Sequence, residues 1–197
     1  MLEIEVKFKV DTHDVIREAL RREGGHYVSR AAETNTLLDT PDQQLFKSGC
    51  GLRVRVNRME DTTTNNSSTN VPTILTASTL TYKGPQQPGS MKVREEIETS
   101  IGDADATMKL LSILGFEARF IFEKRRETWR LGNATVELDE VPRLGCYVEI
   151  EADSESTVKS LLERLDLSNK TPIPATYIAL LIEHARANGL PEDRITF

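Results

Sequence analysis

The chain has 197 residues, 38% of them hydrophobic and 28% charged, enough for one buried core and a single domain over residues 1–197. Its formal net charge of −6 argues against nucleic-acid binding, which needs a basic surface. No apolar run approaches the ~20 residues that span a bilayer, and Glu3 and Glu5 stand where a signal peptide needs basic and then apolar residues. Two cysteines, Cys50 and Cys146, predict neither a disulfide framework nor a zinc site. We therefore expect a cytoplasmic protein without membrane or nucleic-acid partners.

Residues 2–8 alternate strictly between apolar and charged side chains, with Glu3, Glu5 and Lys7 at the charged positions. A period of two residues predicts a β-strand with one apolar and one charged face. For one strand alone, the simplest interpretation is that the charged face points to water. The same pattern returns in five later segments, which makes exposure of every charged face a poorer explanation.

The next elements are predicted in chain order from periodicity and from turn residues. We expect a helix from Asp11 or Thr12 to about residue 23, a strand over 26–39 and a short turn with Leu45 and Phe46. Strands are then expected over 51–56, 74–83 and 91–99. Residues 58–73 include a polar tract without apolar periodicity, which predicts a flexible loop.

The second half of the chain predicts three strands and three helices. A helix is expected over 102–115, with Leu110, Leu111 and Leu114 facing inward. Strands follow over 116–130, 134–140 and 145–152, and helices over 155–165 and 175–187.

About eight strands joined by short turns or single helices favour an antiparallel sheet that closes on itself. The expected fold class is α+β: a closed eight-stranded antiparallel β-barrel with helices packed outside. Closure places the charged strand faces inside, where each charge costs several kcal/mol unless it is paired or hydrated. The interior must therefore hold water, paired charges or a ligand.

The predicted inward positions carry both signs of charge. Arginine and lysine suit phosphate oxygens, whereas clustered carboxylates suit Mg²⁺ or Mn²⁺. No Gly-rich phosphate-binding loop with Lys-Ser/Thr is present, and the three histidines have no nucleophile motif beside them. The inward basic set is Lys7, Arg53, Arg55, Lys83, Arg94, Lys124 and Arg126, and the acidic set is Glu3, Glu5, Glu96, Glu98, Glu137, Asp139, Glu149 and Glu151.

The segment Glu3-Ile4-Glu5-Val6-Lys7 matches the E-x-E-x-K signature of the CYTH superfamily, the triphosphate tunnel metalloenzymes. Later segments match the family in the same order: Asp39-Thr40-Pro41, Leu52-Arg53-Val54-Arg55, Lys83-Gly84-Pro85, Arg94-x-Glu96-x-Glu98, Glu123-Lys124-Arg125-Arg126, Glu137-x-Asp139 and Tyr147-x-Glu149-x-Glu151. The chain thus resembles this family, which includes class IV adenylyl cyclases of the CyaB type and thiamine triphosphatases, from residue 2 to about residue 181.

The resemblance implies an eight-stranded tunnel that binds a triphosphate along its axis with Mg²⁺ or Mn²⁺. The implied metal ligands are Glu3, Glu5, Glu137, Asp139, Glu149 and Glu151, and the implied catalytic residues are Glu5, Lys7 and Glu149. The basic set would hold the phosphates.

Three functions are compatible with these residues. The first is a metal-dependent triphosphatase, the second an adenylyl cyclase that forms cyclic AMP and pyrophosphate, and the third a non-catalytic binder of triphosphate or polyphosphate. We expect the first, because the readable residues are directed to phosphate and metal and none is a clear adenine reader. A monomer and a homodimer are both compatible with the sequence.

Overall fold

The computed structural model describes residues 2–60, 74–87 and 92–197. Within them, the side chains of residues 2, 3, 60, 74 and 92 are not described. Most of the loop predicted over 58–73 lies outside the described residues, and residues 58–60 belong to a strand.

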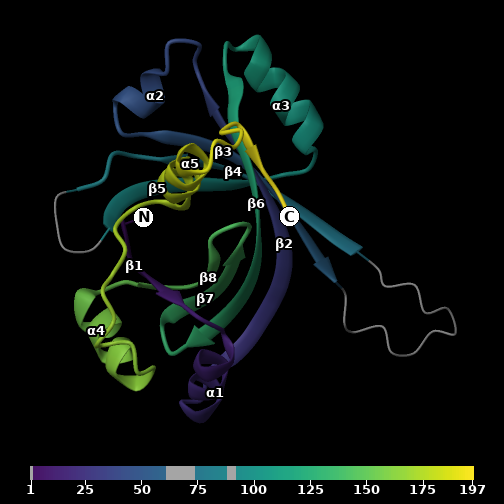
Figure 1. Cartoon of the computed structure of the whole chain (residues 1–197). Helices are drawn as coiled ribbons and strands as arrows, with labels where there is room; N and C mark the ends of the chain where they lie inside the picture. Colours follow the sequence, from purple (N-terminus) through teal and green to yellow (C-terminus); the bar gives the residue numbers. More distant parts are fainter. Residues whose placement is uncertain (1, 61–73, 88–91) are drawn as a thin grey trace, which may run out of the picture.

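Eight antiparallel strands form a closed ring in the order β2-β3-β4-β5-β1-β8-β7-β6, and β6 pairs back with β2 (Figure 1). The predicted closed antiparallel sheet is therefore confirmed. A short strand, β9, adds in parallel to β6. The strands are β1 Leu2–Val10, β2 His26–Asp39, β3 Gly51–Glu60, β4 Ile74–Lys83, β5 Lys92–Ile101, β6 Glu117–Leu131, β7 Ala134–Val141, β8 Gly145–Ala152 and β9 Arg194–Ile195.

Five helices accompany the sheet in the described part of the chain: α1 Asp14–Arg22, α2 Gln44–Lys47, α3 Ala104–Ile113, α4 Glu155–Arg164 and α5 Tyr177–Ala187. Figure 1 shows α1 and α4 at one end of the molecule, near β1, β7 and β8, and α2 and α3 at the other end. None of these helices combines the length and apolar content needed to cross a bilayer.

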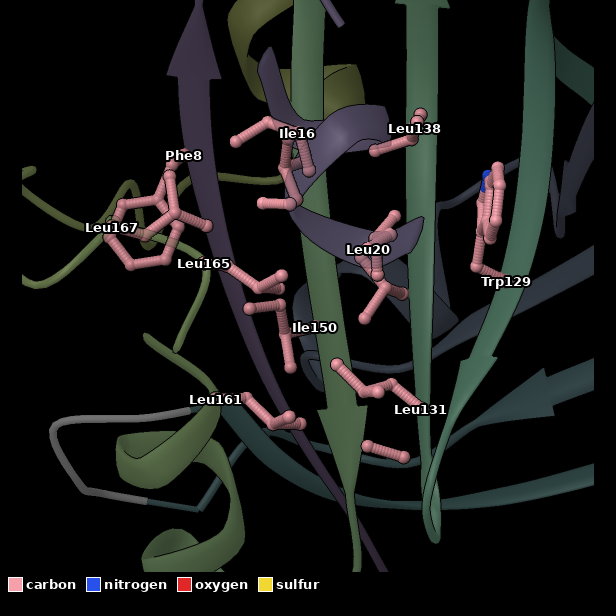
Figure 2. Packing of buried hydrophobic residues seen from close by; sticks show 14 of the residues in the cluster. Phe8, Ile16, Leu20, Trp129, Leu131, Leu138, Ile150, Leu161, Leu165 and Leu167 are labelled. Carbon is pink, nitrogen blue, oxygen red and sulfur yellow. The ribbon is translucent and has the colours of Figure 1, made fainter. Parts of the chain in front are cut away.

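The main core lies on the outer face of the ring under α1 and α4. On β1, Val6, Phe8 and Val10 point outward and are buried beneath these helices, and Ile4 packs against the same core. Figure 2 shows Ile16 and Leu20 of α1 directed at the strands, with Leu161 of α4 on the same core. Burying apolar area at roughly 25 cal/mol per Å² is what holds this face together.

The sequence predicted that all helices pack outside the ring, and helix α5 is an exception. Its residues Tyr177, Leu181 and Ala185 form a second buried cluster with Phe122 of β6 and Tyr147 of β8. Side chains two residues apart on a strand share a face, so Phe122 lies on the same face as the predicted inward residue Lys124. Helix α5 thus packs on inward-facing residues and fills part of the space inside the ring.

Helix α3 corrects one expectation about packing. Leu110 and Leu114 were expected to face inward, but they are 62% and 71% exposed, and only Leu111 is half-buried. Among the described residues, α3 contacts β3 yet buries none of its own side chains, because no second layer covers the helix.

A short helix, α2, replaces the turn expected at Leu45 and Phe46, and Asp39 holds its start. The carboxylate of Asp39 accepts hydrogen bonds from the backbone N–H groups of Thr40 (2.8 Å), Leu45 (3.0 Å) and Phe46 (2.9 Å). Burial raises the pKa of Asp39, but these hydrogen bonds outweigh it and leave the pKa below its ordinary value.

We predict that Asp39→Asn lowers the free energy of unfolding by about 1–2 kcal/mol at neutral pH, because an amide cannot accept all three bonds. Since the folded-state pKa is depressed, the ionised carboxylate stabilises above its unfolded pKa, and this stabilisation is lost as pH falls into the acid range. Urea unfolding should show the difference between the two proteins narrowing below about pH 4. Asp11→Asn, at an exposed position, is the control. A difference between wild type and Asp39→Asn that is independent of pH would contradict this role.

Candidate functional site in the tunnel

The inward strand faces bring the predicted charged residues together in two groups. The first lies on β3, β4 and β5 and is rich in basic side chains. The second lies on β1, β6, β7 and β8 and combines most of the carboxylates with three cations. These groups occupy two arcs of one closed ring, which meet where β5 pairs with β1 and are separated on the other side by β2.

The basic group is built from Arg53, Lys83 and Arg94 on three adjacent strands. Lys83 and Arg94 share one carboxylate, Glu96, which Arg94 contacts at 3.1 Å. Burial, and next the charges of Arg53 and Arg94, lower the pKa of Lys83 to about 8 despite that partner. Among the described side chains of this group, the three cations meet two carboxylates, Glu96 and Glu98, which favours an anionic ligand.

Arg53 shows the same crowding. Its guanidinium donates to Thr81 Oγ1 (3.2 Å) and lies 3.7 Å from Glu98, a carboxylate that is half exposed. Burial, followed by the neighbouring charge of Arg55, lowers the pKa of Arg53 to about 9. Its Nε has no hydrogen-bond partner among the described residues, so a donor remains for a ligand or water.

Arg55 connects the two groups by way of β2. It donates to Asn35 Oδ1 (2.9 Å) and pairs with Glu33 at 3.2 Å. Glu33 also lies 3.5 Å from Lys124 of the second group. Burial raises the pKa of Glu33, but Lys124, Arg55 and Arg126 outweigh it and hold the pKa at about 2.

The second group is organised around Arg126, which with Glu33, Glu137, Asp139 and Glu149 forms what we call the Arg126 cluster. Arg126 donates two hydrogen bonds to Asp139 (2.7 and 2.6 Å) and one to Glu149 (2.6 Å), and it also contacts Glu137. Glu33 lies at the edge of the cluster, 3.8 Å from the same guanidinium. One cation thus serves four carboxylates.

Asp139 is fully buried and its oxygens are already in use. It accepts from Arg126, from Lys124 (3.2 Å) and from the Tyr177 hydroxyl of α5 (2.9 Å). Burial raises the pKa of Asp139, but Arg126 and Lys124 outweigh it and hold the pKa well below its ordinary range. Asp139 therefore holds the side chains of Arg126 and Lys124 in position and binds helix α5 through Tyr177.

Glu149 has the opposite balance. Burial, and next the negative charge of Glu5, raise the pKa of Glu149 to about 7, even though Arg126 contacts it. Arg126 cannot neutralise Glu149 fully because Asp139 and Glu137 share the same guanidinium. Among the described inward side chains of β1 and β8, three carboxylates, Glu5, Glu149 and Glu151, accompany one cation, Lys7, an arrangement that favours a bound cation.

Lys7 is 1% exposed and lies beside Glu149, with 3.8 Å between Nζ and Oε1. Its ammonium donates to the backbone oxygen of Ala175 (2.6 Å) and sits 4.1 Å from the centre of the Tyr177 ring. The segment before α5 therefore fixes the position of this cation.

Three remaining carboxylates also take the predicted inward register. Glu5 is opposite Glu151 across β1 and β8, and Glu149 is opposite Glu137 across β7 and β8. Glu3 is opposite Arg94 in the backbone pairing of β1 with β5, and its side chain lies outside the described residues.

Four residues of this tunnel were missed at the level of sequence: Glu33, Asn35, Thr81 and Tyr177. Glu33 and Asn35 alternate on β2 as the predicted charged residues do elsewhere, so the period-2 rule would have found them. Thr81 accepts from Arg53 and donates to Glu98 (2.7 Å), a role that a threonine between two apolar residues does not signal. Tyr177 could not be found from periodicity, because its position depends on α5 entering the ring.

The donor chemistry of the second group fits a hard divalent cation, since carboxylate oxygens are the ligands that Mg²⁺ and Mn²⁺ prefer. Glu149 and Glu5 bring two carboxylates into electrostatic contact, as the raised pKa of Glu149 shows. Within the described residues, no three His, Cys, Asp or Glu side chains already form a metal-binding group.

A closed antiparallel ring whose inner face carries a cation-rich group and a carboxylate-rich group defines a class of charged-tunnel proteins. The CYTH domain matches residues 1–177, and the chain belongs to this family. The resemblance seen in the strand motifs is thereby confirmed.

Relatives match along nearly their whole length. The "putative adenylate cyclase MJ0240" of Methanocaldococcus jannaschii is 24% identical over 189 residues, which cover 91% of this chain and 98% of the relative. The structure of the PH1819 protein from Pyrococcus horikoshii OT3 is 28% identical, with a TM-score of 0.73 over 92% of this chain and 98% of that one. HpAC1 from Hippeastrum, described as a "putative adenylyl cyclase" with a dominant triphosphatase activity, shares the fold at 17% identity, with a TM-score of 0.66 and 96% of both chains covered.

We predict that Arg126→Met lowers the free energy of unfolding by about 3–5 kcal/mol at pH 7, because several buried carboxylates lose their shared partner. Without the arginine, their folded-state pKa values rise above the unfolded values, so the loss should shrink as the pH falls toward about 5. Urea unfolding at both pH values measures the effect.

Arg125→Met is the matched control. Arg125 precedes Arg126 on β6 and points to the outer face. It pairs there with Glu140, and the side chains of Arg125 and Glu140 are 48% and 42% exposed, respectively. Its loss should cost less than about 1 kcal/mol. Equal losses in the two variants would show that Arg126 does not hold the cluster together.

Proposed function

We propose that this chain is a divalent-metal-dependent hydrolase of triphosphate compounds. One observation carries the proposal: among the described inward side chains, three cations around Lys83 meet two carboxylates, whereas three carboxylates on β1 and β8 meet one cation, Lys7. A triphosphate with a divalent cation supplies the missing negative charge to the first group and the missing positive charge to the second.

The basic side chains would hold the phosphates. Arginine offers two parallel donors to a phosphate, whereas lysine acts as a point charge. Arg53 of β3 and Arg94 of β5 would contact the phosphates farther from the carboxylates of β1 and β8. Lys7 would contact the phosphate nearest those carboxylates. The full proposed phosphate-binding set is Lys7, Arg53, Arg55, Lys83, Arg94, Lys124 and Arg126.

Phosphoryl transfer asks the protein mainly for positioning and charge stabilisation. Glu5 and Glu149 would orient the attacking water and accept its proton. Lys7, held by Ala175 and Tyr177, would stabilise the charge that develops on the phosphate.

Glu5, Glu149 and Glu151, together with Glu3, would hold Mg²⁺ or Mn²⁺. When bound, the cation would neutralise phosphate oxygens and help orient the phosphate chain. The sequence motif also included Glu137 and Asp139 among the metal ligands. In this arrangement Arg126 engages both, so we assign them first to positioning Arg126.

The Hippeastrum relative with a dominant triphosphatase activity supports hydrolysis as the leading proposal. The relative from M. jannaschii named as a cyclase supports a second candidate, the conversion of ATP to cyclic AMP and pyrophosphate. One observation favours this candidate: the inward side chains of Asn35, Asn57 and Thr79 each have a buried polar atom without a hydrogen-bond partner in the described structure. Such neutral groups on adjacent strands suit a nucleobase.

One assay separates these candidates. The purified protein with Mg²⁺ or Mn²⁺ is offered inorganic triphosphate, thiamine triphosphate and ATP, and phosphate, pyrophosphate and cyclic AMP are measured separately. We expect inorganic triphosphate or another small triphosphate to be turned over faster than ATP, with phosphate as the main product. Stoichiometric cyclic AMP and pyrophosphate from ATP would replace the hydrolase by the cyclase, and binding without turnover would leave a triphosphate binder.

Glu149→Gln should reduce metal-dependent turnover by at least about a hundredfold and weaken Mn²⁺ binding measured by calorimetry, because a carboxylate ligand is lost. The fold should persist, since removal of a buried charge beside Glu5 relieves repulsion. Glu140→Gln is the control, because the side chain of Glu140 pairs with Arg125 outside the ring. This variant should retain both metal-dependent turnover and Mn²⁺ binding. Unchanged Mn²⁺ binding in Glu149→Gln would exclude Glu149 as a ligand.

A further inference from the structure

A hollow of about 590 Å³ lies on the outside of the ring, away from the tunnel charges. It forms where α1 approaches the first residues of β2, over the outward face of β6. Its volume falls in the range of small-molecule sites, roughly 300–1,000 Å³. It is lined by Arg17, Arg21, Tyr27, Arg30, Glu127 and Trp129.

The floor of this hollow is built and rigid. Glu127 is 8% exposed and accepts two hydrogen bonds from Arg17 Nε, both 3.1 Å, and one from Trp129 Nε1 (2.7 Å). Trp129 is itself 4% exposed and belongs to the outer core. Figure 2 shows it at the side of that core, on the strand beyond Leu138. The Arg17 and Glu127 charges therefore neutralise one another beneath the hollow.

The rim carries cations that the protein itself does not neutralise. Arg21 and Arg30 are exposed, and neither forms an ion pair with any described residue. Arg21 follows Arg17 by one helical turn on the same face of α1, and its guanidinium lies 5.9 Å from the centre of the Trp129 ring. Two unpaired guanidiniums beside one hollow, on a chain with a net charge of −6, form a local anion-binding feature.

Two aromatic rings line the same hollow. Tyr27 packs edge-on against Trp129, with 5.7 Å between the ring centres and an interplanar angle of 79°. It nevertheless remains 51% exposed, so part of the ring faces solvent at the hollow. The exposed part of the Tyr27 ring contributes nothing to packing inside the protein. It is available for a flat ligand that stacks on the ring.

We propose that this hollow binds a mononucleotide, with the base stacked on Tyr27 and the phosphate held by Arg21 and Arg30. The guanidinium pair supplies bidentate donors for phosphate oxygens, and the exposed ring supplies the surface for a base of any kind. The size of the hollow and the net negative charge of the chain favour one nucleotide over a nucleic-acid strand.

This site is separate from the tunnel although both use β6. Alternate residues of a strand point to opposite faces, so Glu127 and Trp129 face outward while Lys124 and Arg126 face inward. A ligand in the hollow therefore occupies the outer face of the strand that holds the Arg126 cluster.

The chain offers a specific reporter, because Trp129 is its single tryptophan. AMP is titrated into the full chain in the absence of triphosphate, which would itself compete for Arg21 and Arg30, and Trp129 fluorescence is recorded. We expect a saturable change. The double variant Arg21→Gln/Arg30→Gln should weaken AMP binding at least about tenfold, and Tyr27→Leu should weaken AMP binding more than inorganic phosphate binding.

Arg22→Gln is the matched control, since Arg22 neighbours Arg21 on α1 but pairs instead with Glu23 and Asp166. It should bind AMP as the wild type does, and thermal melts should confirm that every variant is folded, which the exposure of the altered side chains favours. The proposal is overturned by the absence of a saturable change, by equal weakening in Arg22→Gln and the double variant, or by Tyr27→Leu weakening AMP and phosphate equally.

Discussion

Everything in this structure depends on the cost of placing ionised groups inside a closed ring. Each buried charge costs several kcal/mol unless it is compensated, and closure removes the open sheet face through which water would reach it. On the side of the ring formed by β6, β7 and β8, Arg126 compensates the buried carboxylates. Its guanidinium donates to Asp139 and Glu149 and contacts Glu137. Lys124 adds compensation for Asp139 and Glu33.

The compensation is incomplete in a directed way. On β3 to β5 the cations exceed their partners, and the pKa of Lys83 falls. Beside β1 and β8 the carboxylates exceed theirs, and the pKa of Glu149 rises. Two opposite imbalances inside one tunnel are unfavourable for the protein alone. An anion and a cation entering together would offset both, so in the function we propose the electrostatics that limits the stability of the ring would also supply the binding energy.

Strict alternation in β1, β3, β7 and β8 was sufficient to predict the strands, their inward faces and the closed sheet, because a period of two fixes which side chains share a face. Periodicity does not report what covers a helix, so the inward face expected for Leu110 and Leu114 was wrong. It also does not report where a helix docks, so the bond from Tyr177 to Asp139 could not be anticipated. Such contacts join residues far apart in the chain and exist only once the ring has closed.

The segment around α5 has a consequence for how the protein is made. Strand β1 pairs with β5 only through residues 2–5. Beyond that pairing, the backbone oxygen of Lys7 accepts a hydrogen bond from the N–H of Ile173 (2.7 Å). Near the start of β6, where β7 is not its partner, β9 pairs with Ile121 and Phe122. Two openings along the strands that are made early are thus filled by residues made late. During synthesis, a nascent chain would expose these edges until residues 173–195 leave the ribosome, and an exposed strand edge pairs readily with other chains. The pairings that close the ring are all made by residues up to 152, so residues 173–195 cover strand edges of a ring that can already form.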